Sequence, residues 1–194
     1  MTPEQFEARR DGIGGSEIAA ILGLDPFSGP LDVWLAKVEG YQKPTTEDME
    51  RGQFLEAGIA DWYAQREQLG AGNLQPGLRL DHGSLPHVFA TPDRISFTAL
   101  STAPTQRPRT RLVSIKAPRR AGDSWGETGG SHVPVGYVLQ LQWEAAVVRS
   151  LPSMPYDWES TMHLVALIDG DLRVYPVETD LELQAQLLDY AAKW

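Results

Sequence analysis

Two short apolar segments separated by a polar connection constrain the fold of this chain more than any other feature. Residues 90–95 and 112–117 are each rich in β-branched and apolar residues, and residues 98–110 between them are rich in Pro, Ser, Thr and Arg. This pattern predicts two neighbouring strands joined by a loop. Asp93 and Lys116 would then meet at one end of a sheet, where a carboxylate can hold a divalent cation and an ammonium can hold a water or a phosphate. An ordinary hairpin with an exposed Asp and an exposed Lys is the alternative.

The length and composition of the chain favour one domain. With 194 residues, of which 42% are hydrophobic, the chain can build one sizeable core but is short for two. We therefore predict a single domain over residues 1–194.

No apolar run approaches the ~20 residues that span a bilayer, and the acidic start at residues 1–4 lacks the basic and apolar blocks of a signal peptide. The absence of cysteine excludes disulfides and thiolate metal sites. These features predict a cytoplasmic protein that does not associate with membranes.

The charges are unevenly distributed. The formal net charge of −9 argues against a protein that coats nucleic acid non-specifically, because phosphate binding depends on Lys and Arg. Residues 107–120, however, contain no acidic side chain and carry Arg107, Arg109, Arg111, Lys116, Arg119 and Arg120. This segment predicts a local phosphate-facing patch around Lys116. A solvated basic loop is the alternative that the charges leave open.

A segment near the N-terminus combines two arginines with a predicted helix start. Arg9 and Arg10 precede a glycine-rich turn at residues 12–15, and Ser16 can cap a helix over residues 17–22. Bare backbone amides, a hydroxyl, a helix N-terminus and guanidinium groups together favour binding of an anion such as a phosphate. A glycine-rich turn without further function explains the same residues.

A long predicted helix carries a carboxylate on its apolar face. Over residues 46–69, helical spacing places Glu56 among Met49, Gly52, Ile59, Ala60 and Tyr63. A charge in that position needs a partner, and a cation is a natural one. A buried Arg is the alternative partner.

A second helix, predicted over residues 134–149, repeats this pattern with an amide. Gln142 lies at the centre of an apolar arc, whereas Gln140 and Glu144 fall on the opposite side. A buried amide must be hydrogen-bonded, either to a backbone carbonyl or to a water or phosphate in an active site.

The other elements read as scaffold. A helix beginning at Pro30 is predicted to turn Leu31, Trp34, Leu35 and Val38 toward the core. Strands at residues 162–168 and 172–177 are predicted to flank a turn at 169–170, and Thr179 or Asp180 to cap a final helix.

Five segments in order along the chain resemble one known family. They are residues 9–23 (RRDGIGGSEIAAILG), 51–56 (RGQFLE), 90–93 (ATPD), 114–116 (SIK) and 137–142 (YVLQLQ). The set resembles the lambda-exonuclease-like family of phage-type alkaline exonucleases, also called the YqaJ viral recombinase family, within the PD-(D/E)xK nucleases. Five blocks in one order are far more specific than any single short motif.

The resemblance implies a fold and an activity. The implied fold is α/β (α+β), with a restriction-endonuclease-like core in which helices flank a mixed sheet. The implied activity is Mg²⁺-dependent digestion of one strand of duplex DNA from its 5′ end, which leaves 3′ single-stranded overhangs, and Mn²⁺ is a possible substitute. Family members act on DNA ends together with a single-strand annealing protein in phage recombination. Some form toroidal homotrimers, so a homotrimer is expected here.

The resemblance also implies roles for individual residues. Asp93 would be a metal ligand together with the backbone carbonyl of Ile115, and Glu56 would be a further carboxylate at the metal. Lys116 would orient or activate the attacking water, and Gln142 would lie beside it. Arg9 or Arg10, with Ser16, would hold the 5′-phosphate.

One position departs from the family pattern. The family strand reads Glu-x-Lys, whereas this chain has Ser114 in place of the Glu. A hydroxyl is a poor Mg²⁺ ligand beside a carboxylate, so impaired cleavage is expected. Asp123 or Glu127 could move in, although nothing in the sequence requires it. A catalytically inactive protein that binds DNA ends, or an endonuclease on the same fold, remains the alternative.

Overall fold

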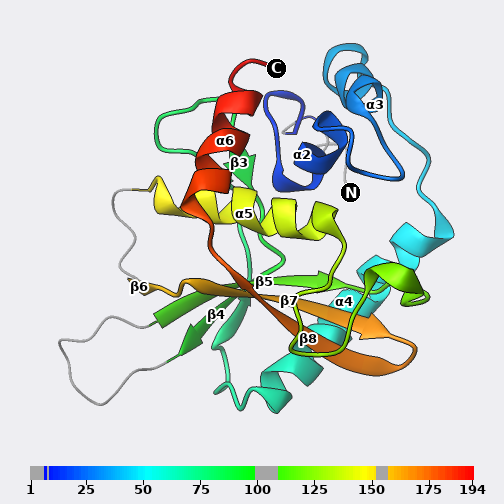
Figure 1. The fold of residues 1–194 in the computed structure, drawn as a ribbon, viewed down its shortest axis with the longest axis vertical. Helices are drawn as coiled ribbons and strands as arrows, with labels where there is room; N and C mark the ends of the chain where they lie inside the picture. The colour runs from blue at the N-terminus through cyan, green and yellow to red at the C-terminus, as the bar shows by residue number, and fades with distance from the viewer. Residues whose placement is uncertain (1–6, 8, 99–108, 152–156) are drawn as a thin grey trace.

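A mixed β-sheet forms the centre of the molecule (Figure 1). The computed structural model describes residues 7, 9–98, 109–151 and 157–194. Along the sheet the strands follow the order β1 (Leu74–Pro76), β4 (Arg94–Thr98), β5 (Arg109–Lys116), β7 (Thr161–Ile168) and β8 (Asp171–Glu178), and β6 (Asp157–Trp158) pairs with β5. Strands β4 and β5 are antiparallel, β5 and β7 are parallel, and β7 and β8 are antiparallel. A separate two-stranded ribbon consists of β2 (Leu80–Asp81) and β3 (Phe89–Ala90).

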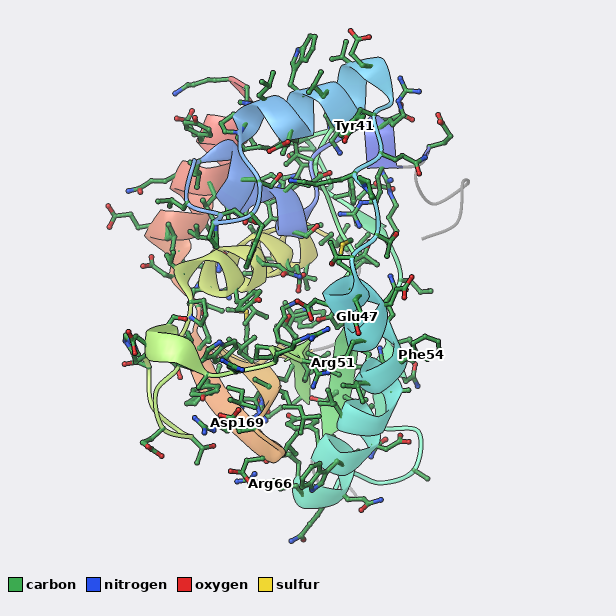
Figure 2. All side chains as sticks on the ribbon, turned by 90° about the vertical axis from the view of Figure 1, so that its right-hand side faces the viewer. Tyr41, Glu47, Arg51, Phe54, Arg66 and Asp169 are labelled. Carbon is green, nitrogen blue, oxygen red and sulfur yellow. The ribbon has the colours of Figure 1, made fainter. Side chains whose placement is uncertain are left out.

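Helices cover both faces of this sheet, which confirms the predicted fold class. The helices are α2 (Gly15–Ile21), α3 (Pro30–Trp34), α4 (Glu47–Arg66), α5 (Val135–Arg149) and α6 (Leu181–Ala191), with a π-helical turn η1 (Leu35–Glu39) after α3 and a 3₁₀ turn η2 (Gly122–Ser124). Helix α5 packs on one face, with α2 and α6 stacked on its outer side (Figure 1). Helix α4 packs on the opposite face, and Figure 2 shows it with Glu47, Arg51 and Phe54 along its first half and Arg66 at its end.

Strand β5 presents alternate residues to these two layers. Val113 and Ile115 pack in the apolar cluster that includes α4, whereas Leu112 packs in the cluster that includes α5. Because successive side chains of a strand point to opposite faces, Ser114 and Lys116 project toward α5. Two of the predicted site positions therefore lie beneath that helix.

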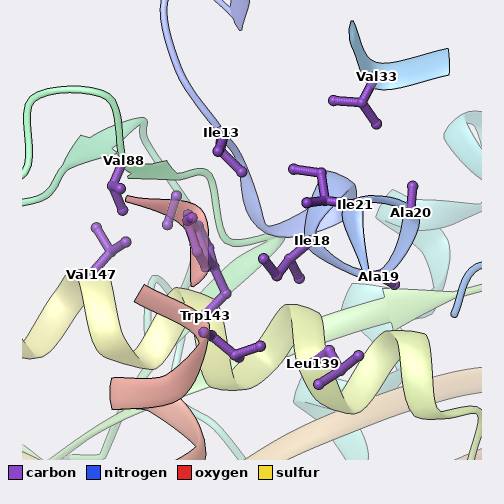
Figure 3. Packing of buried hydrophobic residues seen from close by; sticks show 13 residues of the cluster. Ile13, Ile18, Ala19, Ala20, Ile21, Val33, Val88, Leu139, Trp143 and Val147 are labelled. Atoms are coloured by element: carbon purple, nitrogen blue, oxygen red, sulfur yellow. The ribbon is translucent and has the colours of Figure 1, made fainter. Parts of the chain in front are cut away.

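Helix α5 is buried on both sides. Trp143, fully buried, packs with Ile18, Ile21 and Val147 in the layer between α5 and α2 (Figure 3). Its indole Nε1 donates to the carbonyl oxygen of Phe89 at 2.8 Å. Since the other side of α5 packs on the sheet, Gln142 and Glu144 in the middle of this helix are removed from water.

Several predicted element ends are confirmed. The Thr46 side chain accepts from the Met49 amide at the start of α4, and the Asp180 side chain accepts from the Leu183 amide at the start of α6. The turn between β7 and β8 has positive φ at Asp169 and Gly170, as a two-residue hairpin turn requires.

Two local predictions are wrong. Helix α2 begins at Gly15 and its N-cap is Gly14, so Ser16 lies inside the first turn and does not cap it. The predicted core face after Pro30 is also wrong, because Leu31, Trp34 and Val38 are exposed. The regular helix ends after five residues and continues as a π-helical turn, so the 3.6-residue spacing does not hold there.

No helix in the described parts of the chain is long and apolar enough to cross a membrane.

Candidate active site

The strand pair identified from the sequence brings Asp93 against β5. Asp93 directly precedes β4, whose first residue, Arg94, pairs with Val113 in the antiparallel register. Oδ2 of Asp93 accepts from the Ser114 hydroxyl at 3.0 Å and from the Ile115 amide at 2.7 Å. The prediction that these segments are neighbours is confirmed, and the carboxylate is fixed by two donors from β5.

Lys116 joins this cluster from the end of β5. Its Nζ lies 3.4 Å from Oδ2 of Asp93 and 5.2 Å from the centre of the Tyr137 ring on α5. Burial opposes the ammonium charge, but the nearby carboxylates of Asp93 and Glu144 outweigh that penalty and raise the pKa of Lys116 above its ordinary value. Lys116 is therefore held as a cation within contact of Asp93.

Glu144, on α5, is a member of the cluster that the sequence interpretation missed. Its side chain is buried, and Oε1 accepts from Nε2 of Gln140 at 2.8 Å. Burial and, after it, the charge of Asp93 raise the pKa of Glu144 to about 8, against the opposing effects of Gln140 and Lys116. Helical spacing placed Glu144 opposite the apolar arc and so toward solvent. The overlooked signal is that α5 is apolar on both sides, which buries every charge in its middle turns.

Gln142 lies elsewhere, so the prediction that it faces Asp93 and Lys116 is wrong. Its Nε2 donates to the Glu178 carbonyl at 2.7 Å, and its Oε1 accepts from the Asp180 amide at 3.0 Å and from Nε2 of Gln184 at 2.9 Å. These bonds join α5 to the connection between β8 and α6. The backbone-bonded alternative left open by the sequence is the one observed.

This placement of Gln142 predicts an effect on stability. Gln142→Ala leaves the buried Gln184 amide group, the Asp180 backbone amide and the Glu178 carbonyl without this partner, so we expect the free energy of unfolding to fall by about 2–3 kcal/mol. Urea denaturation measures the loss, and the exposed Gln186 on α6 provides the control, since Gln186→Ala should change stability by less than about 0.5 kcal/mol. Equal losses in the two variants would contradict the structural role of Gln142.

Glu56 is paired with an arginine. Nη1 of Arg94 donates to Oε1 of Glu56 at 2.5 Å and to the backbone oxygen of Asp93 at 2.6 Å. Glu56 therefore borders the cluster through Arg94, and this Arg partner is the alternative that the sequence left open. Its predicted role as a metal ligand is not supported by this pairing.

The predicted phosphate site contains Arg9 and Ser16 but not Arg10. Nη2 of Arg9 donates to the Ser16 hydroxyl at 2.6 Å. Arg10 turns the other way and donates to the carbonyl oxygens of Lys37 and Val38. Of the two arginines that the sequence offered, the structure places Arg9 beside Ser16.

The start of α2, which carries Ser16, packs against the helix that borders the Asp93 cluster. A Cβ atom added to Gly15, the first residue of α2, would lie 3.3 Å from the Cγ atoms of both Gln140 and Glu144. The start of α2 therefore packs directly on α5 above the Asp93 cluster. A larger residue at this close approach of the two helices would require the α5 side chains to shift by a few tenths of an ångström.

Two arginines of the basic segment, residues 107–120, form ion pairs with acidic residues elsewhere in the chain, which the charge pattern did not predict. Arg111 forms an ion pair with Glu159, and Arg119 forms ion pairs with Glu47 and Asp48. Arg107 lies outside the described residues. Because Arg111 and Arg119 are ion-paired, the basic patch expected from the sequence is weaker. Lys116 is a residue of this segment that lies in the site.

Comparisons with known proteins agree with the resemblance seen in the sequence. The pattern of the YqaJ-like viral recombinase domain matches residues 4–151. The uncharacterized protein YqaJ of Bacillus subtilis (strain 168) is 29% identical over 89 residues, which make up 45% of this chain and 27% of that protein. The matched part is thus about a quarter of the curated relative's length.

Solved structures share the fold at low sequence identity. An alkaline exonuclease, LHK-Exo from Laribacter hongkongensis, is 18% identical with a TM-score of 0.65, and the match covers 99% of this chain and 90% of the other. LHK-Exo in complex with dAMP gives a TM-score of 0.67 with the same identity and coverage. A phage-related exonuclease from Haemophilus somnus 129PT is 11% identical with a TM-score of 0.61, over 93% of this chain and 90% of that one.

Proposed function

This chain belongs to the YqaJ-like viral recombinase domain family, and on that premise we propose that it is an Mg²⁺-dependent exonuclease acting on duplex DNA. The proposed enzyme digests one strand from its 5′ end and leaves a 3′ single-stranded overhang. The observation that carries the proposal is the convergence of Asp93, Ile115 and Lys116 at one end of β4 and β5. An acidic oxygen and a held ammonium are the groups that phosphodiester hydrolysis needs beside the scissile phosphate.

The donor atoms at this site suit a hard divalent cation. All three donors to the Asp93 carboxylate contact Oδ2, and within the described residues none contacts Oδ1. The N–H and C=O of one strand residue point toward the same neighbouring strand, so the Ile115 carbonyl shares the side of Asp93. Carboxylate and carbonyl oxygens are the ligands that Mg²⁺ prefers. In the described residues, no group of three or more His, Cys, Asp or Glu side chains is arranged to hold a metal, so a protein-only cage is not expected.

Each residue of the proposed site would contribute a different part of the hydrolysis. A bound Mg²⁺ would polarise the scissile phosphate and acidify a water. Asp93 and the Ile115 carbonyl would hold the cation. The Lys116 ammonium would fix the attacking water or a phosphate oxygen by donating to it.

Polarity of digestion tests the proposal. A linear duplex labelled at the 5′ end of one strand should release labelled mononucleotide at the start of the reaction, whereas a 3′ label should stay on a long fragment. Release of the 3′ label first would contradict 5′-to-3′ digestion. Binding of DNA ends without release of either label would favour the end-binding alternative that Ser114 raises.

We also propose that Arg9, with Ser16, recognises the terminal 5′-phosphate. A guanidinium beside a hydroxyl suits a doubly charged phosphate. Arg9→Ala should therefore reduce the preference for a 5′-phosphorylated over a 5′-hydroxyl duplex by about tenfold, the size of one hydrogen bond to a charged group. Competition binding of the two duplexes measures this ratio.

Arg10→Ala is the matched comparison, because Arg10 bonds to the backbone of η1 and not to Ser16. Its phosphate preference should equal that of the wild type. A loss of preference in Arg10→Ala and not in Arg9→Ala would reverse the assignment.

The family likeness further supports a ring-shaped homotrimer and a single-strand annealing partner as parts of the proposal. Analytical ultracentrifugation at several protein concentrations would test the trimer.

A further inference from the structure

The second carboxylate of the site is the feature that the proposed function leaves unassigned. Ser114 stands at the strand position where the resemblance implies a Glu, and its hydroxyl already donates to Asp93. A divalent cation beside Lys116 and only one carboxylate would be incompletely neutralised. A second acidic group near Asp93 is therefore needed for tight binding.

Glu144 is a buried carboxylate with an unused oxygen. Its side chain is 1% exposed, and among the described residues Oε2 has no hydrogen-bond partner, although Oε1 is held by Gln140. A buried carboxyl oxygen without a partner is costly to keep in a folded protein. Native proteins keep such a group where it takes part in catalysis or where a bound ion or water completes its bonding.

Glu144 lies on the face of α5 that Lys116 approaches. Nζ of Lys116 lies 5.2 Å from the centre of the Tyr137 ring, and Tyr137 and Glu144, seven residues apart, share one face of the helix. The Cγ atom of Glu144 is also close to the start of α2, because a Cβ atom added to Gly15 would lie 3.3 Å from it. The charges of Asp93 and Lys116, both in the proposed site, act on Glu144. Ser114 and Lys116 project from β5 toward the helix that carries Glu144.

We propose that Glu144 supplies the missing carboxylate, so that a divalent cation binds between Asp93 on the strand pair and Glu144 on α5. The inference rests on the proposed function, because it names a ligand of the same site. The carboxylate that the resemblance implies on β5 is then contributed from the overlying helix. The site keeps two carboxylates despite Ser114, and the impairment expected from the sequence does not follow from Ser114 alone.

Direct binding of Mn²⁺ to the metal-free protein tests the inference without relying on catalysis. Titration followed by the electron paramagnetic resonance signal of free Mn²⁺ should show that Glu144→Gln binds at least about tenfold more weakly than the wild type. Ser114→Glu in the Glu144→Gln background returns a carboxylate to the strand and should recover most of that loss. Glu182→Gln, which removes an exposed carboxylate on α6, is the control and should bind as the wild type does.

Thermal melting of the metal-free proteins separates ligation from a structural role. Glu144→Gln keeps the shape of the side chain and removes a buried ionisable group, so its Tm should equal or exceed that of the wild type. A structural role alone would instead lower the Tm and leave Mn²⁺ affinity unchanged.

The outcomes separate this inference from the proposed function. If the wild type digests duplex DNA and Glu144→Gln binds Mn²⁺ equally well, the inference fails and the proposed function stands. If the double variant, Ser114→Glu with Glu144→Gln, binds Mn²⁺ as weakly as Glu144→Gln does, the two positions do not hold the same cation and the inference also fails. If the wild type neither binds Mn²⁺ nor digests DNA, both fail together.

Discussion

Asp93→Asn is expected to lower the rate of duplex digestion by about 10³-fold, the size of losing a well-placed electrostatic group at a reaction centre. The amide keeps an oxygen that can accept from the Ile115 amide and the Ser114 hydroxyl, so the strand pair should persist. It removes the negative charge that would bind the cation and that lies nearest to Lys116. Single-turnover digestion of a 5′-phosphorylated duplex measures the change.

Asp61→Asn is the matched control for this variant. Asp61 is exposed on α4, so its amide should digest DNA at the wild-type rate. DNA-end binding by Asp93→Asn should stay within a few-fold of the wild type, because the Arg9 and Ser16 contact does not involve Asp93. Equal rates for Asp93→Asn and the wild type would remove Asp93 from the reaction.

Trp143→Ala is expected to reduce the free energy of unfolding by about 3–5 kcal/mol, the range for removal of a large buried aromatic side chain. Trp143 is fully buried between α5 and α2, and its loss also leaves the Phe89 carbonyl without the indole donor. Because α5 carries Glu144 and packs on β5, this change should also loosen the site. Chemical denaturation monitored by circular dichroism gives the free energy.

Trp62→Ala, on α4, tests whether the effect comes from burial. Trp62 is 46% exposed, so its replacement should cost less than about 1.5 kcal/mol. A similar loss for both tryptophans would mean that the layer between α5 and α2 does not dominate stability.

The strand pair was predictable because its signals are local. Two β-rich segments flanking a polar connection predict an antiparallel pair, and the register then fixes Asp93 opposite Ser114 and Ile115. The parallel pairing of β5 with β7 joins residues about fifty positions apart, so local patterns did not reveal it.

The residues of α5 were harder to assign because periodicity reports which residues share a face and not what covers each face. Gln142 was correctly placed on an apolar arc, yet its side chain bonds to the junction of β8 and α6. The opposite side, with Gln140 and Glu144, is covered by α2 instead of water. The packing of α2 on α5 therefore explains why Glu144 is buried.

Charged partners distant in sequence explain the other differences. The Glu56 carboxylate and the Arg94 guanidinium come from α4 and β4, and their pairing depends on how that helix lies against the sheet. The basic segment was expected to face phosphate, but Arg111 pairs with Glu159, which follows β6, and Arg119 pairs with acidic residues at the start of α4. The charge pattern of a segment gives the sign of its net charge. It does not identify the side chains with which those charges form ion pairs in the fold.

We propose that the Asp93 site performs metal-dependent hydrolysis from DNA ends. This proposal is tested by the release of acid-soluble nucleotide by the wild type from a linear 5′-phosphorylated duplex and from a closed-circular duplex of the same sequence, each with Mg²⁺ and with EDTA. We expect release from the linear DNA with Mg²⁺ only, and none from the circle under either condition. Release that persists in EDTA, cutting of the circle, or no release from the linear duplex with either Mg²⁺ or Mn²⁺ would contradict it.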